Sequence, residues 1–508
     1  MMQLVWFKRD LRTVDHAALQ AACQAGPVLA IYVVEPELWQ QPDASRRHWY
    51  QIAGALHDLR EDLAELGLDL LLQRGEITDV LASIQRRCGR FVLHAHEETG
   101  NDWSFRRDRL VRAWCRERGL DFVEQRQFGV FRGLRSRDGW SARWHDQMRA
   151  PIAALPRAIR AADWPGQWPA VEAVAPVLPD DGLLEPQPGG RRAGLATLES
   201  FLNERGKSYH RGISSPLTAE QAGSRLSPYI SFGCLSLREI VKATEVRRRA
   251  LREQGDRTGW QRALSAFSQR LRWHCHFIQK LESQPRLEFE NMARFYDGMR
   301  EDHFDSLRYQ AWCRGETGFP LVDACMRSLT VTGWLNFRMR AMLMAFAAYH
   351  LWLHWREPAL HLARMFSDYE PGIHYCQVQM QSGVTGINTV RVYNPVKQSM
   401  DQDPDGEFIR RWLPELAVVP GDWIHQPWLM SAAQQQKAGL CIGKHYPSPV
   451  VEHLAAAKAA REAVWARRQS PEAQRESRQV QQQLGSRRKH VSRQKKRTES
   501  VPVQRSLF

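Results

Sequence analysis

The chain has 508 residues, which is too many for one ordinary hydrophobic core, so we expect two globular units. Its 71 lysine and arginine residues outnumber 56 aspartate and glutamate residues, and the net charge of +15 favours a polyanionic partner such as nucleic acid. No apolar run reaches the roughly 18 residues of a membrane span, which excludes a membrane-spanning protein. The nine cysteines form no Cys-x-x-Cys pair, which predicts a cytoplasmic protein with reduced thiols and no metal site.

Short apolar strands alternate with helices over residues 1–130. The strands are expected at residues 3–7, 28–34, 70–72, 91–94 and 122–124. Residues with helical apolar spacing separate them, and Asp15 is the expected N-cap of the first helix because its carboxylate accepts free backbone N–H groups. This alternation predicts an α/β domain, a doubly wound parallel sheet with helices on both faces. No Gly-x-Gly-x-x-Gly motif follows the first strand, so a dinucleotide in the crevice of this sheet is not expected.

Changes in composition divide the rest of the chain into three parts. Residues 131–194 form a connector, with eight prolines between residues 151 and 190, that should be largely extended. Over residues 195–450 the strand pattern nearly vanishes and helical spacing dominates, which predicts an all-α domain. Residues 451–508 are predicted to be a basic, largely disordered tail, because seven basic residues and no acid lie between residues 487 and 497. A solvated tail and a nucleic-acid-binding arm both fit that composition.

The segment at residues 315–412 combines helical apolar spacing with tryptophan, histidine, arginine and acidic residues. A purely structural helix does not need these polar side chains. We therefore expect a pocket for a large planar ligand in this segment.

Several motifs in a fixed order make the chain similar to the photolyase/cryptochrome family over about residues 3–430. They are WFKRDLR near the start, the proline-rich connector, SRLSPYISFGCLS at residues 224–236, TGFPLVDACMR, TGWLNFRMR and YNPVKQSMDQDPDGEFIRRWLPEL. The resemblance implies an N-terminal α/β domain, a helical domain that holds FAD, and blue-light chemistry. In the enzymes of this family, excited reduced flavin donates an electron to a pyrimidine dimer that is flipped out of DNA, and the electron later returns.

The start of the SRLSP motif is the candidate site for the FAD phosphates. By position, Tyr209 and Ser224 resemble family residues near those phosphates. Arg225, Leu226 and Ser227 follow at a helix start, where unpaired N–H groups and the helix dipole favour an anion. On its own, this motif is equally typical of a capped helix.

Three further residues are assigned to the flavin ring by resemblance. Arg340 and Asp368 lie where the family pairs an arginine with an aspartate beside the ring, although a structural salt bridge is the alternative. Glu370 belongs to the same run of residues and is also assigned to the cofactor site. His374 corresponds to the residue that faces flavin N5, where photolyases commonly have asparagine. Because histidine can donate a hydrogen bond or a proton near neutral pH, we expect His374 to tune the flavin redox state.

The usual electron relay to the flavin is incomplete in this sequence. Trp355 matches the middle tryptophan of the family relay, but Val378 stands at the position nearest the flavin and Met380 replaces another tryptophan. The possible replacements are Trp352, Tyr375 and Tyr393.

The lesion pocket is assigned to Trp273 and Trp334, with Arg270 binding substrate. Arg270 stands where cyclobutane-dimer photolyases have a glutamate, so it reverses the charge and is suited to a phosphate. A shift of one residue in the alignment would place Gln269 at this position, and a glutamine there resembles the branch of the family that repairs 6-4 lesions. Asn336 and Phe337 replace the histidine pair of that branch at residues 336–337, which makes 6-4 repair by proton transfer less favoured.

The sequence therefore predicts a monomeric, FAD-dependent DNA photolyase for pyrimidine dimers, of the cyclobutane type. The main alternative is a cryptochrome-type blue-light receptor without DNA repair, and a third is a light-independent flavoprotein or nucleic-acid-binding module with the same fold. The HEETGNDW stretch at residues 96–103 lies where family members bind a folate or deazaflavin antenna, so a second chromophore is possible there.

Overall fold

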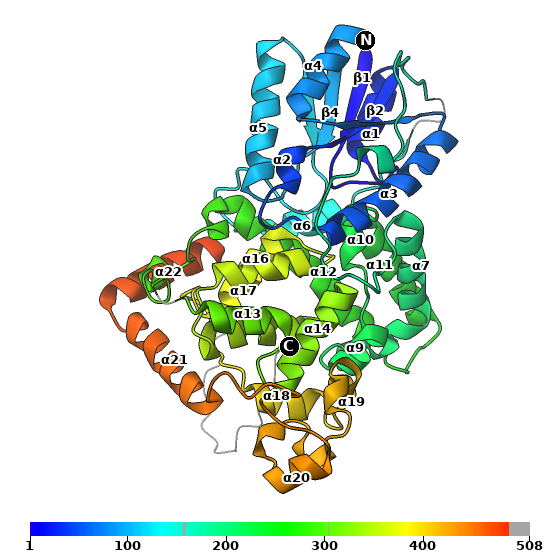
Figure 1. Cartoon of the computed structure of the whole chain (residues 1–508). Helices are drawn as coiled ribbons and strands as arrows, with labels where there is room; N and C mark the ends of the chain where they lie inside the picture. Colours follow the sequence, from blue (N-terminus) through cyan, green and yellow to red (C-terminus); the bar gives the residue numbers. More distant parts are fainter. Residues whose placement is uncertain (156–158, 303, 487–508) are drawn as a thin grey trace.

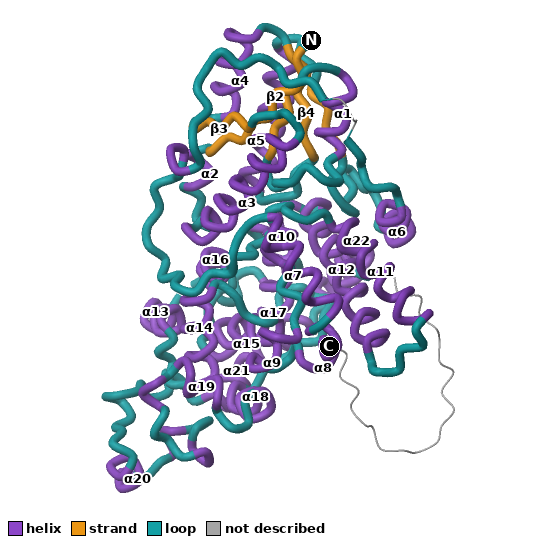
Figure 2. Tube along the Cα trace, turned by 90° about the vertical axis from the view of Figure 1, so that its right-hand side faces the viewer, coloured by secondary structure: helices purple, strands orange, loops and turns teal. Residues whose placement is uncertain are grey.

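The structure is a computed structural model that describes residues 1–155, 159–302 and 304–486. A sheet with its covering helices lies at one end of the molecule, and helices make up the remainder (Figure 1). Seen from the side, all the strands gather at that one end (Figure 2). Among the described helices, none is both long and apolar enough to span a membrane.

The sheet has five parallel strands in the order β3-β2-β1-β4-β5. They are β1 Met2–Phe7, β2 Val28–Val34, β3 Leu70–Arg74, β4 Phe91–His96 and β5 Phe122–Gln125. Val5 pairs with Ala30 on one side and His94 on the other, and every residue of β2 is buried. Burial on both faces explains the continuous apolar runs, and the predicted α/β fold is confirmed.

Helices cover both faces of this sheet. They are α1 Ala17–Ala25, α3 Arg46–Glu65, α4 Ile77–Cys88 and α5 Asp102–Glu117, while the short α2 Pro36–Trp39 follows β2 and α6 Trp140–Arg149 packs against the helical part. The predicted N-cap of α1 is wrong: His16 is the N-cap, and its Nδ1 accepts from the backbone N–H of Leu19 at 3.0 Å. The Asp15 carboxylate instead accepts hydrogen bonds from the Ser236 hydroxyl and the Ala153 backbone N–H, so it joins three distant segments.

The connector crosses from the sheet to the helical part with little regular structure. Its described residues between 151 and 190 contain one short 3₁₀ turn, η1 Glu172–Val174, and Ala161 forms a bridge with Val28 at the start of β2. The described residues between 151 and 190 are therefore largely extended, whereas the expectation is wrong for residues 140–149 of the connector, which form α6.

The helical part is built around α12 and α17, which cross closely. Its helices are α7 Arg191–Asn203, α8 Tyr209–Gly212, α9 Pro216–Ala222, α10 Ser227–Ser231, α11 Leu237–Glu253, α12 Trp260–Ser283, α13 Ser306–Arg314, α14 Pro320–Thr332, α15 Phe337–Ala345, the π-helix η5 Phe346–His350, α16 Arg356–Met365, α17 Pro371–Ser382, α18 Pro395–Gln402, α19 Glu407–Trp412 and α20 Ala432–Lys437. A Cβ on Gly372 would lie 2.6 Å from the Cα of Ile278, so glycine is what allows α17 to approach α12.

The expectation of disorder from residue 451 is wrong for residues 453–484. Two helices, α21 His453–Arg468 and α22 Pro471–Leu484, run along one side of the helical part (Figure 1). They bury Ala460, Val464, Ala473, Val480 and Leu484, so a few apolar side chains are enough to hold them against the core. The basic run between residues 487 and 497 lies outside the described residues.

Candidate functional site

A cavity of about 810 Å³ opens in the helical part, between α8, α12, α15 and α17. This volume lies within the range of about 300–1,000 Å³ that is usual for ligand sites. Ten of the predicted site residues line it: Tyr209, Ser224, Arg225, Ser227, Arg270, Trp334, Arg340, Asp368, Glu370 and His374. The predicted pocket in the segment at residues 315–412 is therefore part of a larger site that also draws on residues 209–274.

Three predicted site residues do not reach the cavity. Leu226 is buried just before α10, and Trp355 is buried with its Nε1 donating to Asn291 Oδ1 at 2.8 Å. Trp273 lies off the face of α12 that the cavity uses. That face is formed at helical spacing by Phe267, Arg270, Leu271 and His274.

The loop before α10 is held by side chains from other segments. Arg205 donates to the backbone carbonyls of Gly223 and Ser224, the latter at 2.8 Å. Arg225 has a left-handed backbone, with φ of 59°, and its Nε donates to Gln187 Oε1 at 3.1 Å. Its guanidinium lies 4.0 Å from the centre of the Trp334 ring, a cation–π contact. Sequence reasoning missed Arg205, because nothing in the motif indicates a partner 19 residues upstream.

Arg340 and Asp368 form a two-pronged ion pair in the cavity wall. Arg340 Nη1 and Nη2 each donate to one oxygen of Asp368 at 2.9 Å, and Nε donates to the Leu335 carbonyl at 2.7 Å. Burial would raise the pKa of Asp368, but the charge and hydrogen bonds of Arg340 outweigh it and hold that pKa below its ordinary value. The pair therefore presents a fixed arginine and a fixed carboxylate to a ligand.

Glu370 connects this wall to the α/β domain. Its Oε2 accepts from Arg9 Nη2 at 2.8 Å, and Arg9 Nε also donates to the Ser231 carbonyl at 3.0 Å. Burial raises the pKa of Glu370 even though Arg9 opposes the shift. Arg9 belongs to the WFKRDLR motif, so that motif helps to build the site from the other domain.

Buried polar atoms without a partner test whether a cofactor fits this cavity. Among the described residues, five such atoms belong to side chains that line it: His274 Nε2, Asn336 Oδ1, Arg338 Nε, Glu370 Oε1 and Gln377 Oε1. Buried polar groups are normally hydrogen-bonded, so this mixture of donors and acceptors indicates a polar ligand. The lining also has five arginines against two carboxylates, which favours an anionic one. A planar ring with polar edges and a diphosphate, as in FAD, meets both requirements.

His374 lines the cavity as a neutral residue. Its Nε2 lies 2.8 Å from the Ala359 carbonyl oxygen, which can only accept, so Nε2 carries the proton and Nδ1 is an acceptor. Burial lowers the pKa of His374 to about 4. The expectation that His374 donates a proton near neutral pH is therefore wrong, although a redox-tuning role through Nδ1 stays a prediction.

This protonation state gives a testable pH dependence. Because the folded-state pKa lies near 4, His374 stays neutral throughout the interval from pH 5.5 to 8. In that interval, we expect His374 to cause no pH-dependent change in the absorption spectrum of the bound flavin or in its photoreduction rate. The pH profiles of the parent protein and of His374→Asn should therefore have the same shape. A transition near pH 6.5 that is present in the parent protein and absent from His374→Asn would contradict this assignment.

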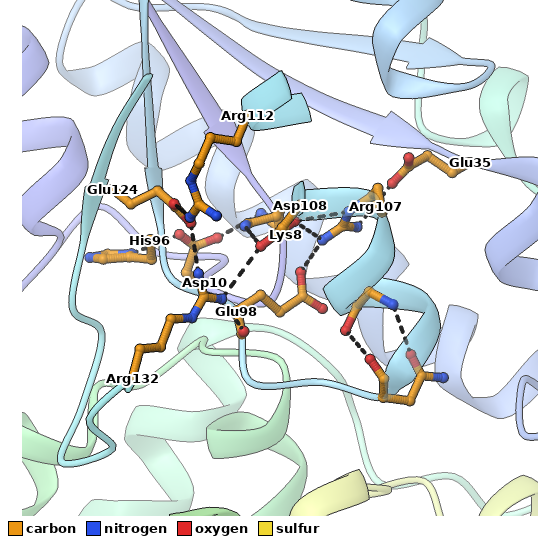
Figure 3. A network of polar contacts seen from close by, with 12 residues as sticks. Lys8, Asp10, Glu35, His96, Glu98, Arg107, Asp108, Arg112, Glu124 and Arg132 are labelled. Atoms are coloured by element: carbon orange, nitrogen blue, oxygen red, sulfur yellow. Dashed lines mark hydrogen bonds and ion pairs between the residues drawn. The ribbon is translucent and has the colours of Figure 1, made fainter. Parts of the chain in front are cut away.

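A second cavity of about 100 Å³ lies at the carboxyl ends of β1 and β2, next to the HEETGNDW stretch. Figure 3 shows a network of charged side chains that includes Lys8, Glu35, Glu98 and Arg107 from the cavity lining. Arg107 contacts Glu35 at 3.0 Å, Asp108 at 2.9 Å and also Glu98, while Lys8 contacts Asp108 at 2.9 Å. The space is smaller than the roughly 300 Å³ of a typical small-molecule site, so a folate or deazaflavin would have to displace these side chains. A second chromophore stays a prediction.

Asp10, His16 and His96 form a buried group beside this network. Their potential ligand atoms all lie within 4.8 Å of one another. Asp10 Oδ2 lies 2.7 Å from His96 Nδ1 and 3.0 Å from His16 Nε2. These are direct polar contacts, so the group needs no ion to hold it together.

Comparisons with known proteins agree with the fold and the cavity. Residues 3–131 match the DNA photolyase family, and residues 267–466 match the FAD binding domain of DNA photolyase. A cryptochrome DASH of Gloeobacter violaceus is 30% identical over 91% of this chain and 95% of its own length. A deoxyribodipyrimidine photo-lyase of Vibrio cholerae is 27% identical over 89% of this chain and 97% of its own length. The crystal structure of a Synechocystis cryptochrome has a TM-score of 0.80 and 25% identity, covering 91% of this chain and 99% of that one.

These similarities extend over both domains and include the segment that carries the Arg340–Asp368 pair. The unpartnered polar atoms and the excess of arginines fit the cofactor of that family. The chain belongs to the photolyase/cryptochrome family of FAD-binding flavoproteins.

Proposed function

We propose that the protein is a light-driven DNA photolyase that repairs cyclobutane pyrimidine dimers. The observation that carries this proposal is the composition of the larger cavity. The residues suited to FAD share it with a half-buried aromatic residue, Trp334, and with Arg270, Arg338 and Arg391. A flipped nucleotide and a buried flavin could therefore occupy one continuous space.

The chain's own residues would bind and orient both molecules. Bound reduced FAD supplies one electron on excitation by blue light. The Arg340–Asp368 pair fixes the wall at which the flavin ring is held, and His374 Nδ1 offers an acceptor that stays unprotonated near neutral pH. Trp334 offers a stacking surface for an extruded base, while the arginines neutralise phosphates.

Two observations favour the cyclobutane lesion over the 6-4 lesion. Asn336 uses its Nδ2 to donate to the carbonyls of Ile213 and Ser214, so it has no proton to exchange with a substrate. His274 also lines the cavity, but burial lowers its pKa to about 4, so it is neutral near pH 7. Among the described lining residues, no protonated histidine is therefore at hand for the proton transfer that the 6-4 reaction uses.

A cryptochrome-type receptor is the second candidate. Relatives that carry either name are similarly close to this chain, and Val378 in the cavity wall replaces an aromatic residue. A receptor would bind FAD in the same cavity and would use light to change a protein interface without restoring DNA.

Repair of defined lesions separates the two candidates. The reduced, FAD-loaded protein is mixed without oxygen with oligonucleotides that contain one cyclobutane dimer, one 6-4 lesion or no lesion, as single and double strands. We expect blue light to restore the cyclobutane dimer in both forms and to leave the 6-4 lesion unchanged, with dark samples as controls. No restoration of either lesion by a protein with bound, reduced flavin would refute the repair function and favour the receptor.

A further inference from the structure

Tyr369 forms part of the wall between the two cavities. It lines the larger cavity together with His374 and Asp368, and it also lines the smaller cavity at the ends of the sheet strands. We propose that Tyr369 is the electron donor that reduces the oxidised flavin in the light, with Asp43 as the acceptor of its proton. This rests on FAD in the larger cavity and does not depend on DNA repair.

The contacts of Tyr369 place its ring at the cofactor cavity and its hydroxyl at the Asp43 carboxylate, which can accept a proton. Its ring meets the His374 ring edge to face at 5.2 Å and stacks on the His48 ring at 5.6 Å. Its hydroxyl donates to Asp43 Oδ2 at 2.7 Å, and the same oxygen accepts from Asn101 Nδ2 at 3.1 Å. Asp43 itself is buried, with 4% of its surface exposed. A cavity-lining phenol is therefore hydrogen-bonded to a buried carboxylate.

This carboxylate matters because a phenol that loses an electron becomes a strong acid. A buried site cannot keep the resulting positive charge, so the proton has to leave with the electron. Burial and Asp43 raise the pKa of Tyr369, so the residue is a neutral phenol until it is oxidised. The hydrogen bond to Asp43 supplies the path for that proton.

The other aromatic residues are less suited to the first electron transfer. Of those that line the cavity, Trp334 has the Arg225 guanidinium 4.0 Å from its ring centre. Neither Tyr209 nor Tyr393, which also line it, donates a hydrogen bond to a carboxylate among the described residues. Val378 lines the cavity but is aliphatic, and Trp355 does not reach it. The half-buried Trp352 has the Arg300 guanidinium 4.5 Å from its ring centre, and a cation there opposes formation of a positive indole.

Tyr375 can pass the oxidised state onward. The His374 ring links it to Tyr369, since that ring lies 5.2 Å from the Tyr369 ring and 5.5 Å from the Tyr375 ring. On its other side, the Tyr375 ring lies 6.4 Å from the Trp355 ring. Tyr369, Tyr375 and Trp355 thus form a continuous aromatic path from the cavity wall into the helical core.

The electrons and protons balance as follows. Tyr369 would give one electron to the light-excited oxidised flavin, its phenolic O–H bond would break, and its proton would form a new O–H bond on Asp43. A thiol in solution then gives one electron and one proton to the tyrosine, directly or through Tyr375, and pairs of oxidised thiols form a disulfide. Asp43 releases its proton to solvent.

Photoreduction of the FAD-loaded protein under blue light and without oxygen, with a thiol present, tests the proposal. Electron paramagnetic resonance follows the tyrosyl radical, and absorbance follows the flavin. We expect Tyr369→Phe, which keeps the ring, to remove the radical signal and slow photoreduction at least 10-fold. Asp43→Asn keeps the tyrosine but removes the base, and we expect it to slow photoreduction and weaken the effect of D₂O on the rate. FAD content is measured first for each variant.

Tyr349→Phe is the matched control, since its buried hydroxyl has no hydrogen-bond partner among the described residues and it does not line either cavity. The proposal would be overturned if the radical signal were unchanged in Tyr369→Phe. It would also be overturned if Trp355→Phe removed the signal while Tyr369→Phe did not. If Tyr369→Phe fails to retain FAD, the photoreduction rate and the D₂O effect of Asp43→Asn are used instead, and values equal to those of the parent protein would overturn the proposal. Dimer repair by the chemically reduced parent protein is measured separately, and its failure would count against the repair function instead.

Discussion

Replacing Arg340 by alanine is expected to weaken FAD binding on the order of 100-fold. The substitution leaves Asp368 buried without the partner that now donates two hydrogen bonds at 2.9 Å. A hydrogen bond from a charged arginine to a bound ligand contributes about 1.5–3 kcal/mol, and each 1.4 kcal/mol is tenfold in a dissociation constant. Titration of the apoprotein with FAD, followed by flavin fluorescence, measures the loss.

The charge on Asp368 gives this prediction a pH signature. Without Arg340, burial is left to raise the pKa of Asp368, so lowering the pH should neutralise the carboxylate and recover part of the affinity. Arg340→Lys should give an intermediate loss, because lysine keeps the charge but cannot form both parallel bonds. The control is Arg314→Ala, which removes an exposed arginine from a surface ion pair with Glu316. An unchanged dissociation constant in Arg340→Ala would show that the pair is only structural.

Trp334→Ala is expected to reduce the preference for dimer-containing DNA over undamaged DNA by about 5–150-fold, the effect of about 1–3 kcal/mol of base stacking. Binding to undamaged DNA should change little, because phosphate contacts dominate it. Trp334→Phe keeps an aromatic face and should retain most of the preference. Competition binding with both DNAs at one salt concentration measures the ratio.

Two further tryptophans make this test specific. Trp465 on α21 is 48% exposed and serves as the matched control, with no expected change in Trp465→Ala. The sequence motifs assigned Trp273 to the lesion together with Trp334, but Trp273 does not line the cavity. A larger effect in Trp273→Ala than in Trp334→Ala would contradict the geometry described here.

The sequence predicted the elements that carry strong local patterns. The apolar runs of β1 and β2 identified a buried parallel sheet, and the motifs around Arg340 and Asp368 identified two residues that the structure pairs in one cavity wall. Helix rotation was harder to predict: motif alignment selected Trp273 on α12, whereas the helical spacing of residues 267, 270, 271 and 274 defines the face at the cavity.

The remaining differences come from contacts between distant segments. The proton position on His374 depends on the Ala359 carbonyl in another helix, and Glu370 depends on Arg9 from the other domain. Tyr369 gains its role from Asp43, 326 residues away in the chain. The helices of residues 453–484 were missed because their few apolar residues fold only against the core. No local pattern encodes such partners.

Counting dimers restored per bound FAD tests the central claim most directly. The flavin is reduced once, excess reductant is removed, and dimer-containing DNA is supplied in tenfold excess under blue light without oxygen. A photolyase takes back the electron that it donates, so we predict that all the dimers are restored while the flavin stays reduced. Restoration of no more than one dimer per FAD, or oxidation of the flavin in step with repair, would contradict a catalytic repair function.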